Sequence, residues 1–169
     1  MRNNFVNLSL EELKIGEEKI FPEILKIRNE NFVRMNMYNN KLISLEEHLN
    51  WIRTHLQNKT KRIFKIIFEE KLIGALITSN ISLSKKESEW AFYLTKNSKT
   101  GLGAIVEYKF LDLFFKTYPE FELKCEVLEF NKSVISLHKK IFKLYNNYQK
   151  YLLMMNNYMK IYLLSQLIL

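Results

Sequence analysis

One stretch of the chain, from Glu89 to Lys116, restricts the possible folds more than any other. It reads as a strand-like run (Glu89 to Leu94), a polar loop (Thr95 to Thr100), and Gly101-Leu102-Gly103 opening a long, largely apolar helix. A helix N-terminus presents unpaired backbone N–H groups, and glycine lets a phosphate approach them closely. The stretch therefore predicts a strand–loop–helix unit that could hold a pyrophosphate, although an ordinary strand-to-helix turn also uses glycine.

The rest of the chain alternates between strand and helix patterns. Ser44 followed by Glu47 forms a capping box before a stripe of Leu45, Leu49, Ile52 and Leu56, which predicts an amphipathic helix. An earlier helix carries Ile20, Ile24 and Ile27, and Asn131 caps a later one. Strands are expected at residues 4–10, 62–68, 72–79, 89–94, 121–128, 142–148 and 158–164. The expected order is β-α-α-β-β-β-α-β-α-β-β, an α/β (α+β) class.

Length and composition limit the organisation to one domain, residues 1–169, because the 169-residue chain is 47% hydrophobic and has only 2 Pro and 4 Gly. The formal charge of +8 favours an anionic ligand. A lysine-rich surface that serves solubility explains most of these charges equally well. The lysines are spread along the chain without a nucleic-acid-binding signature, so a phosphate-bearing small molecule is expected and a nucleic-acid partner is not.

The same sequence argues against a membrane, disulfide or metal role. It has no apolar run of about 20 residues, and residues 1–10 lack the apolar core of a signal peptide. The single Cys125 alternates with Leu123 and Val127, which favours a buried structural thiol, and no Cys/His cluster has metal-ligand spacing. We expect a cytoplasmic protein without a metal.

The strand order and the glycine turn resemble the GNAT acetyltransferases. In that family the loop reads Arg or Gln, two residues, Gly, one residue, and Gly or Ala; here the stretch runs from Ser98 to Gly103. The resemblance implies a mixed sheet of about seven strands with about four helices, splayed between the fourth and fifth strands. It also implies acetyl-CoA as cosubstrate, held by Lys99, Thr100, Gly101, Leu102, Gly103 and Ala104. Ser98 replaces the usual Arg or Gln, so Lys99 is expected to supply the charge, and Gly103→Val is expected to block the cofactor.

Other stretches are similar to the PseH group, which acetylates a nucleotide-linked amino sugar in pseudaminic acid biosynthesis for flagellin glycosylation. They are Arg28-Asn29, Val33-Arg34, Met37-Tyr38, Ile43-Ser44, Glu47-His48, Trp51-Ile52, Leu72-Ile73-Gly74, Ser79-Asn80-Ile81 and Glu89 to Tyr93. The resemblance implies contacts to the nucleotide or the sugar from Arg28, Met37, Tyr38, His48, Trp51, Asn80 and Tyr93. Core packing is the alternative for Met37, Tyr38 and Trp51.

Direct acetyl transfer needs an oxyanion donor, a thiolate acid and a route for the amine proton. The family pattern implies the Leu94 N–H as oxyanion donor and Asn131 as a contact to the pantetheine arm or a helix cap alone. The usual acid is a Tyr seven residues after that Asn, and here this position is His138, which could instead be a core histidine. Glu126 or Glu89 could act as base, with proton loss to water as the alternative.

These features predict an acetyl-CoA-dependent N-acetyltransferase acting on UDP-4-amino-4,6-dideoxy-N-acetyl-β-L-altrosamine, as a monomer or homodimer. Two alternatives stay open. The first is a protein N-terminal acetyltransferase. The second is a catalytically inactive GNAT-fold binding module, because Ser98 and His138 both depart from the family pattern at functional positions.

Overall fold

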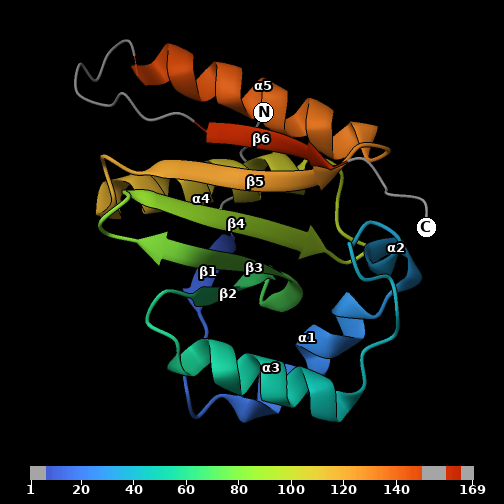
Figure 1. Ribbon diagram of the computed structural model, residues 1–169. Helices are drawn as coiled ribbons and strands as arrows, with labels where there is room; N and C mark the ends of the chain where they lie inside the picture. Colours follow the sequence, from blue (N-terminus) through green and yellow to red (C-terminus); the bar gives the residue numbers. More distant parts are fainter. Residues whose placement is uncertain (1–6, 150–158, 165–169) are drawn as a thin grey trace.

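The computed structural model describes residues 7–149 and 159–164. One mixed sheet has its strands in the order β1-β2-β3-β4-β5-β6, and α4 lies behind it in the view of Figure 1 while α1 and α3 lie below it. The strands are β1 (Leu8–Glu12), β2 (Arg62–Phe68), β3 (Lys71–Ser82), β4 (Glu87–Leu94), β5 (Glu122–Leu128) and β6 (Met159–Leu164). The helices are α1 (Phe21–Arg28), α2 (Asn31–Arg34), α3 (Leu45–Gln57), α4 (Leu102–Thr117) and α5 (Lys132–Gln149), with a 3-10 turn at Glu18–Ile20.

The mixed α/β architecture confirms the expected class, but the element counts differ from the sequence prediction. The described residues form six strands and five α-helices, where about seven and about four were expected. The predicted strand at 142–148 was wrong, because α5 continues through Gln149. Asn31–Arg34 adds a short helix that the sequence pattern did not indicate. Residues 4–6 of the first expected strand and Tyr158 of the last lie outside the described residues.

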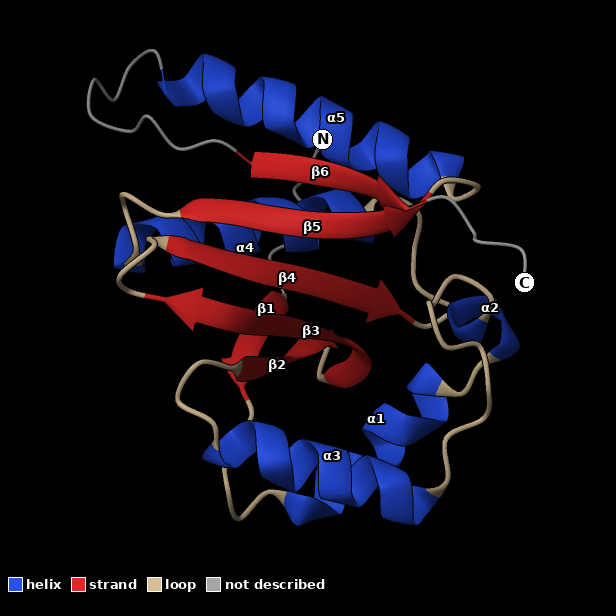
Figure 2. Ribbon diagram, in the orientation of Figure 1, coloured by secondary structure: helices blue, strands red, loops and turns tan. Residues whose placement is uncertain are grey.

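The pairing mode of the strands changes once across the sheet. β1 to β4 pair antiparallel, whereas β4–β5 and β5–β6 pair parallel, as Figure 2 shows by the arrows. The β2–β3 hairpin turns at Glu69 and Glu70, which both have positive φ (48° and 65°), the conformation that a two-residue primed turn requires. Parallel pairing needs crossover connections, and α4 and α5 supply them.

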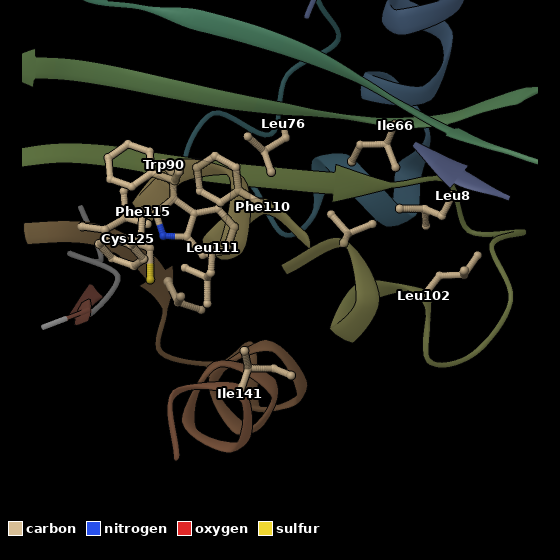
Figure 3. Packing of buried hydrophobic residues seen from close by; sticks show 14 of the residues in the cluster. Leu8, Ile66, Leu76, Trp90, Leu102, Phe110, Leu111, Phe115, Cys125 and Ile141 are labelled. Atoms are coloured by element: carbon tan, nitrogen blue, oxygen red, sulfur yellow. The ribbon is translucent and has the colours of Figure 1, made fainter. Parts of the chain in front are cut away.

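Two hydrophobic clusters lie on opposite faces of the sheet. The larger one joins the sheet to α4 and α5, and Trp90, Phe110, Leu111 and Cys125 pack together in it (Figure 3). The smaller one joins β2 and β3 to α1 and α3 through Phe21, Ile24, Ile52, Ile63 and Ala75. Each face of β4 therefore meets a different helical layer.

The expected caps are present. Ser44 Oγ accepts from the Glu47 N–H at 3.2 Å, and Glu47 Oε2 accepts from the Ser44 N–H at 2.8 Å, which completes the capping box of α3. Asn131 Oδ1 accepts from the Val134 N–H at 3.3 Å and begins α5. Among the described residues, no helix is long and apolar enough to cross a membrane.

Candidate active site

The central feature of the site is a splay between β4 and β5. The two strands pair only at Glu87–Glu122, Ser88–Leu123 and Glu89–Lys124, although β4 continues to Leu94 and β5 to Leu128. Beyond Glu89, β4 pairs with β3 alone, and beyond Lys124, β5 pairs with β6 alone. The sheet therefore opens between its fourth and fifth strands, as the GNAT resemblance implied.

The backbone N–H groups of β4 point alternately toward β3 and toward this opening. The Thr95 N–H donates to the Ile73 carbonyl at 2.7 Å, so Thr95 points its backbone toward β3. Successive strand residues point their N–H groups to opposite sides, and the Leu94 N–H therefore points toward the β5 side. Gly74 lies opposite Leu94, and an added Cβ there would lie 2.1 Å from the Tyr93 carbonyl oxygen. Only glycine fits at this position, because a side chain would separate β3 from β4.

The N-terminus of α4 lies at the open end of the splay. Gly101 is the N-cap residue with φ of +92°, a conformation that glycine adopts without strain. The N–H groups of Leu102 and Ala104 donate to the carbonyls of Lys99 and Gly101. No described residue accepts a hydrogen bond from the N–H groups of Gly101 or Gly103. Of the six residues predicted to hold the pyrophosphate, Leu102 and Ala104 therefore have bonded N–H groups, whereas Gly101 and Gly103 have N–H groups free for an anion.

The charged neighbour of this turn is already paired. Lys99 Nζ lies 2.7 Å from Glu69 Oε1 and 4.9 Å from the centre of the Phe68 ring. Both partners of the ion pair are exposed, and such surface pairs contribute only about 0–1 kcal/mol. Lys99 can therefore exchange Glu69 for a phosphate at little cost. Thr100 is exposed beside it.

A substituted Gly103 would also act on the protein core. An ideal Cβ at Gly103 would lie 3.3 Å from Leu137 Cδ2 and 4.0 Å from the Phe92 ring. The added group would thus press on the packing of α4 against α5 and β4, so Gly103→Val would disturb this core as well as any bound pyrophosphate.

The predicted acid lies on the α4–α5 side of the splay. His138 is buried on α5, its Nδ1 is 2.8 Å from Glu107 Oε1 on α4, and its ring meets the edge of Trp90 at 5.5 Å between centroids. Trp90 follows Glu89, the last β4 residue that pairs with β5. His138 therefore lies beside the vertex of the splay, and both sequence-based alternatives, a core position and a place beside the reaction, fit its location.

The two candidate bases project from the opposite face of the sheet. Along β5, Leu123, Cys125 and Val127 are buried against the helices α4 and α5, so the exposed Glu126 faces away from them. Glu89 faces the same way from β4, and one of its oxygens accepts from Asn80 Nδ2 at 2.9 Å. Glu126 lies beyond the last β5 residue that pairs with β4, whereas Glu89 lies at the closed end of the splay. Asn80 has positive φ (53°) and supports Glu89.

Comparisons with known proteins agree with this geometry. The acetyltransferase PseH of Campylobacter jejuni (serotype O:23/36, strain 81-176) is 27% identical over 136 residues, 80% of this chain and 79% of PseH. The structure of C. jejuni PseH with acetyl coenzyme A is similar with a TM-score of 0.60 and 22% identity, over 79% of this chain and 85% of that chain. This chain is an acetyl-CoA-dependent N-acetyltransferase that is similar to PseH.

The fold is shared more widely than the sequence. A Vibrio cholerae spermidine N-acetyltransferase, solved with CoA and spermine, is similar with a TM-score of 0.68 at 17% identity, over 80% of this chain and 79% of that one. No protein-family model matches the sequence. The enzyme class therefore follows from the PseH relatives, whereas the structural likenesses support the fold.

Arg28 and Tyr93, which were both predicted to contact the acceptor, lie together. Burial raises the pKa of the Tyr93 phenol above its usual value, and the Arg28 charge opposes that rise. Burial also lowers the pKa of Arg28, beside Tyr93 and Arg34. Arg28 Nη2 donates to the Asn39 carbonyl at 2.9 Å, while its buried Nη1 has no partner among the described residues. Arg28 thus keeps one donor for an anionic ligand.

The remaining predicted acceptor residues divide into buried and exposed. His48 is 3% exposed and its Nε2 lies 3.1 Å from the Phe21 carbonyl oxygen, so it fastens α3 to α1 and offers little surface to a nucleotide. Burial lowers the pKa of His48. Tyr38 is 84% exposed and Trp51 is 40% exposed, which disagrees with core packing for these two residues; Met37 is half-buried.

Two residues that the sequence patterns did not single out also belong to the site. Glu107 is the buried partner of His138, and its place on the apolar face of α4, one turn from Leu111 and Phe110, is a signal that spacing could have revealed. Glu30 accepts from Thr95 Oγ1 at 2.6 Å and from the Lys96 N–H at 2.8 Å. It joins the end of α1 to the loop after β4, a contact that no local pattern indicates.

Other parts of the described chain do not compete with this site. A surface hollow of about 360 Å³ between β1, the end of α3 and β2 is lined by Leu13, Lys14, Leu56, Lys61 and Ile63, which include none of the predicted site residues. Within residues 7–149 and 159–164, no three His, Cys, Asp or Glu side chains gather as a metal site requires. The splay is therefore the candidate active site.

Proposed function

We propose that this N-acetyltransferase moves the acetyl group of acetyl-CoA to the 4-amino group of UDP-4-amino-4,6-dideoxy-N-acetyl-β-L-altrosamine, a step of pseudaminic acid biosynthesis. The observation that carries the proposal is the splay between β4 and β5, with an α4 N-terminus at its open end and separate groups on its two faces. The PseH relatives support the choice of acceptor.

Acetyl-CoA supplies an activated thioester, and this chain's own residues would bind and orient it. The free N–H groups of Gly101 and Gly103, with the exchangeable Lys99, suit a pyrophosphate. The Leu94 N–H, directed into the splay, suits the oxyanion that forms at the thioester carbonyl. Asn131 caps α5 with its side-chain oxygen and keeps its amide for the pantetheine arm.

Two groups on opposite faces would handle protons. Glu126 is exposed on the acceptor face and would take the proton from the attacking amine, directly or through water. His138 on the other face would give a proton to the departing thiolate. Glu89 is the weaker base because Asn80 and the closed end of the splay hold it.

The acceptor would be bound by groups suited to a nucleotide. Arg28 keeps a guanidinium N–H for the diphosphate, and the exposed Tyr38 and Trp51 provide flat surfaces for a uracil. Met37, Tyr93 and Asn80 would complete the pocket. His48 would act indirectly, by holding α3 on α1. We propose a monomer or homodimer in the cytoplasm.

The test is release of CoA thiol from acetyl-CoA with three acceptors: the UDP-4-amino sugar, spermidine and a peptide with a free N-terminus. We expect kcat/KM for the sugar to exceed the other two by about 100-fold, a difference of about 2.7 kcal/mol in transition-state binding. Preference for the peptide would favour the protein-acetylating alternative, and no turnover with any of the three acceptors would favour a binding module.

A variant pair tests the base. Glu126→Gln is expected to lower kcat for the sugar by about 100-fold, because an amide cannot accept the amine proton. Glu129→Gln, also exposed and just beyond β5, is the matched control and should retain full activity. Equal rates for the two variants would assign the amine proton to water.

A further inference from the structure

The interior of the protein holds a carboxylate that the proposed mechanism does not use. Glu107 on α4 is fully buried, and its neighbours on the same helix face are Val106, Phe110 and Leu111. Its Oε1 is bonded to His138 Nδ1, while its Oε2 has no hydrogen-bond partner among the described residues. Burying a carboxylate with one unpaired oxygen among apolar side chains therefore lowers the stability of the folded protein.

The stability of the folded protein does not explain why position 107 carries a carboxylate. Replacing a buried ionic group by a well-packed apolar residue is often neutral or stabilising, and the surrounding positions of α4 are apolar. The charge of Glu107 also affects the pKa of Cys125 on strand β5. Burial first, and then the charges of Glu107 and Glu126, raise the pKa of its thiol to about 12. The Glu107 charge thus acts on the residue that follows Lys124, the last β5 residue paired with β4.

The geometry of His138 assigns a use to Glu107. Nδ1 faces Oε1 at 2.8 Å, and an ionised carboxylate can only accept, so with Glu107 ionised Nδ1 carries and donates the proton and Nε2 is left for a second partner. The two residues come from different helices that pack against each other, and Trp90 closes the ring's side. The ring is held in one orientation next to the vertex of the splay.

We propose that Glu107 is a positioning residue for acetyl transfer: it holds the His138 ring through Nδ1–H and stabilises the imidazolium whose Nε2–H protonates the departing sulfur. The inference rests on the proposed function. In the step, the C–N bond forms and the thioester C–S bond breaks. The Nε2–H bond breaks as an S–H bond forms on CoA. The amine's proton leaves to Glu126 or water, and solvent returns a proton to Nε2.

Kinetics of matched variants test the assignment with acetyl-CoA and the UDP-4-amino sugar. Glu107→Gln removes the charge at nearly constant shape and is expected to lower kcat by about 10- to 100-fold, with KM for acetyl-CoA within about twofold. Glu107→Asp keeps the charge and should recover part of kcat. Asp112→Asn, an exposed position of α4 that pairs with Lys116, is the control and should be unchanged.

A double mutant separates positioning from general damage. In a His138→Gln background, Glu107→Gln should lower kcat no further, because the group it acts through is gone. The melting temperature of Glu107→Leu should equal or exceed that of the wild type. Full additivity with His138→Gln, an unchanged kcat in Glu107→Gln, or a large loss of melting temperature in Glu107→Leu would overturn the proposal.

A readout without turnover keeps this test independent of the acceptor. The chain has three histidines, so ¹⁵N spectra of histidine-labelled protein can be assigned with His138→Gln. We expect His138 to carry a proton on Nδ1 in the wild type and to lose that signature in Glu107→Leu. A bare Nδ1 in the wild type would contradict the proposal even if acetyl transfer is observed. Conversely, if Nδ1 of His138 is protonated but no acetyl transfer is measured, only the proposed function would be refuted.

Discussion

Trp90 and Phe92 project from one face of β4 into the α4–α5 core, whereas Glu89 and Tyr93 project from the other face, where Tyr93 packs against the cluster of α1 and α3. On the cofactor face, most of the groups assigned to binding are backbone N–H donors, and the helix that carries them packs on the core through the buried Leu102 and Val106. On the acceptor face, several of the assigned groups are exposed side chains. Changes on the first face should therefore act on folding and cofactor binding together, and changes on the second on acceptor binding alone.

The largest expected effect tests the backbone dependence of the cofactor face. Gly74→Ala would place a Cβ 2.1 Å from the Tyr93 carbonyl and 2.9 Å from Leu94 Cδ2, so β3 and β4 must move apart. We expect the free energy of unfolding to fall by about 3 kcal/mol, measured by urea denaturation. Gly16→Ala is the control: Gly16 has φ of +98° but no atom within 4 Å, so only backbone strain of about 1 kcal/mol applies. Equal losses would show that Gly74 is not a point of close approach.

A medium effect tests the acceptor face. Tyr38→Ala removes a ring that is 84% exposed, so we expect KM for the UDP-4-amino sugar to rise about 10-fold through lost stacking. The melting temperature and KM for acetyl-CoA should stay the same. Leu83→Ala, at a side chain 74% exposed in the β3–β4 turn, is the control and should change neither KM. An unchanged KM for the sugar in Tyr38→Ala would remove Tyr38 from the acceptor site.

The smallest expected effect concerns pH. Burial lowers the pKa of His48 in the folded protein below its unfolded value of about 6.5, so the unfolded state binds the proton more readily. The contribution of His48 to stability is present above the unfolded pKa and is lost as pH falls through the folded pKa. We expect the free energy of unfolding to decrease from pH 7 to pH 5, and this slope to be shallower in His48→Gln.

His55, also on α3, contributes to the same pH dependence of the free energy of unfolding, because burial lowers its pKa as well. It therefore provides a comparison for His48. His55→Gln should remove its own part of the pH dependence and leave that of His48 in place. A wild-type slope that neither substitution alters would assign the pH dependence to other groups and leave both histidines out of it.

Local patterns predicted the parts of this fold that depend on neighbouring residues. The capping box of Ser44 and Glu47, the alternation of Phe121 to Leu128 and the turn at Gly101 all act within a few positions, and all three were found where expected. The error at 142–148 arose because an aromatic-rich run fits a strand as well as the end of a long helix.

Contacts between distant residues could not be predicted in the same way. The bond from Thr95 to Glu30 joins residues 65 positions apart, and the bond from His48 to Phe21 spans 27. The partner of His138 lies 31 positions away on another helix. The GNAT resemblance indicated where His138 would lie, whereas only the packing of α4 on α5 reveals that it has a buried carboxylate as partner.

Because side chains alternate along β4, the register of this strand decides which residues face the proposed cofactor and which face the proposed acceptor. A one-residue insertion or deletion within Glu87–Leu94 would reverse the faces, turning Trp90 and Phe92 toward the acceptor and Glu89 and Tyr93 into the core. The irregular pairing between Ser79 and Ser82 fixes where the strand starts relative to β3. Variation in chain length should consequently be tolerated between α2 and α3 and excluded from β4, so acceptor preference can diverge without loss of the transfer chemistry.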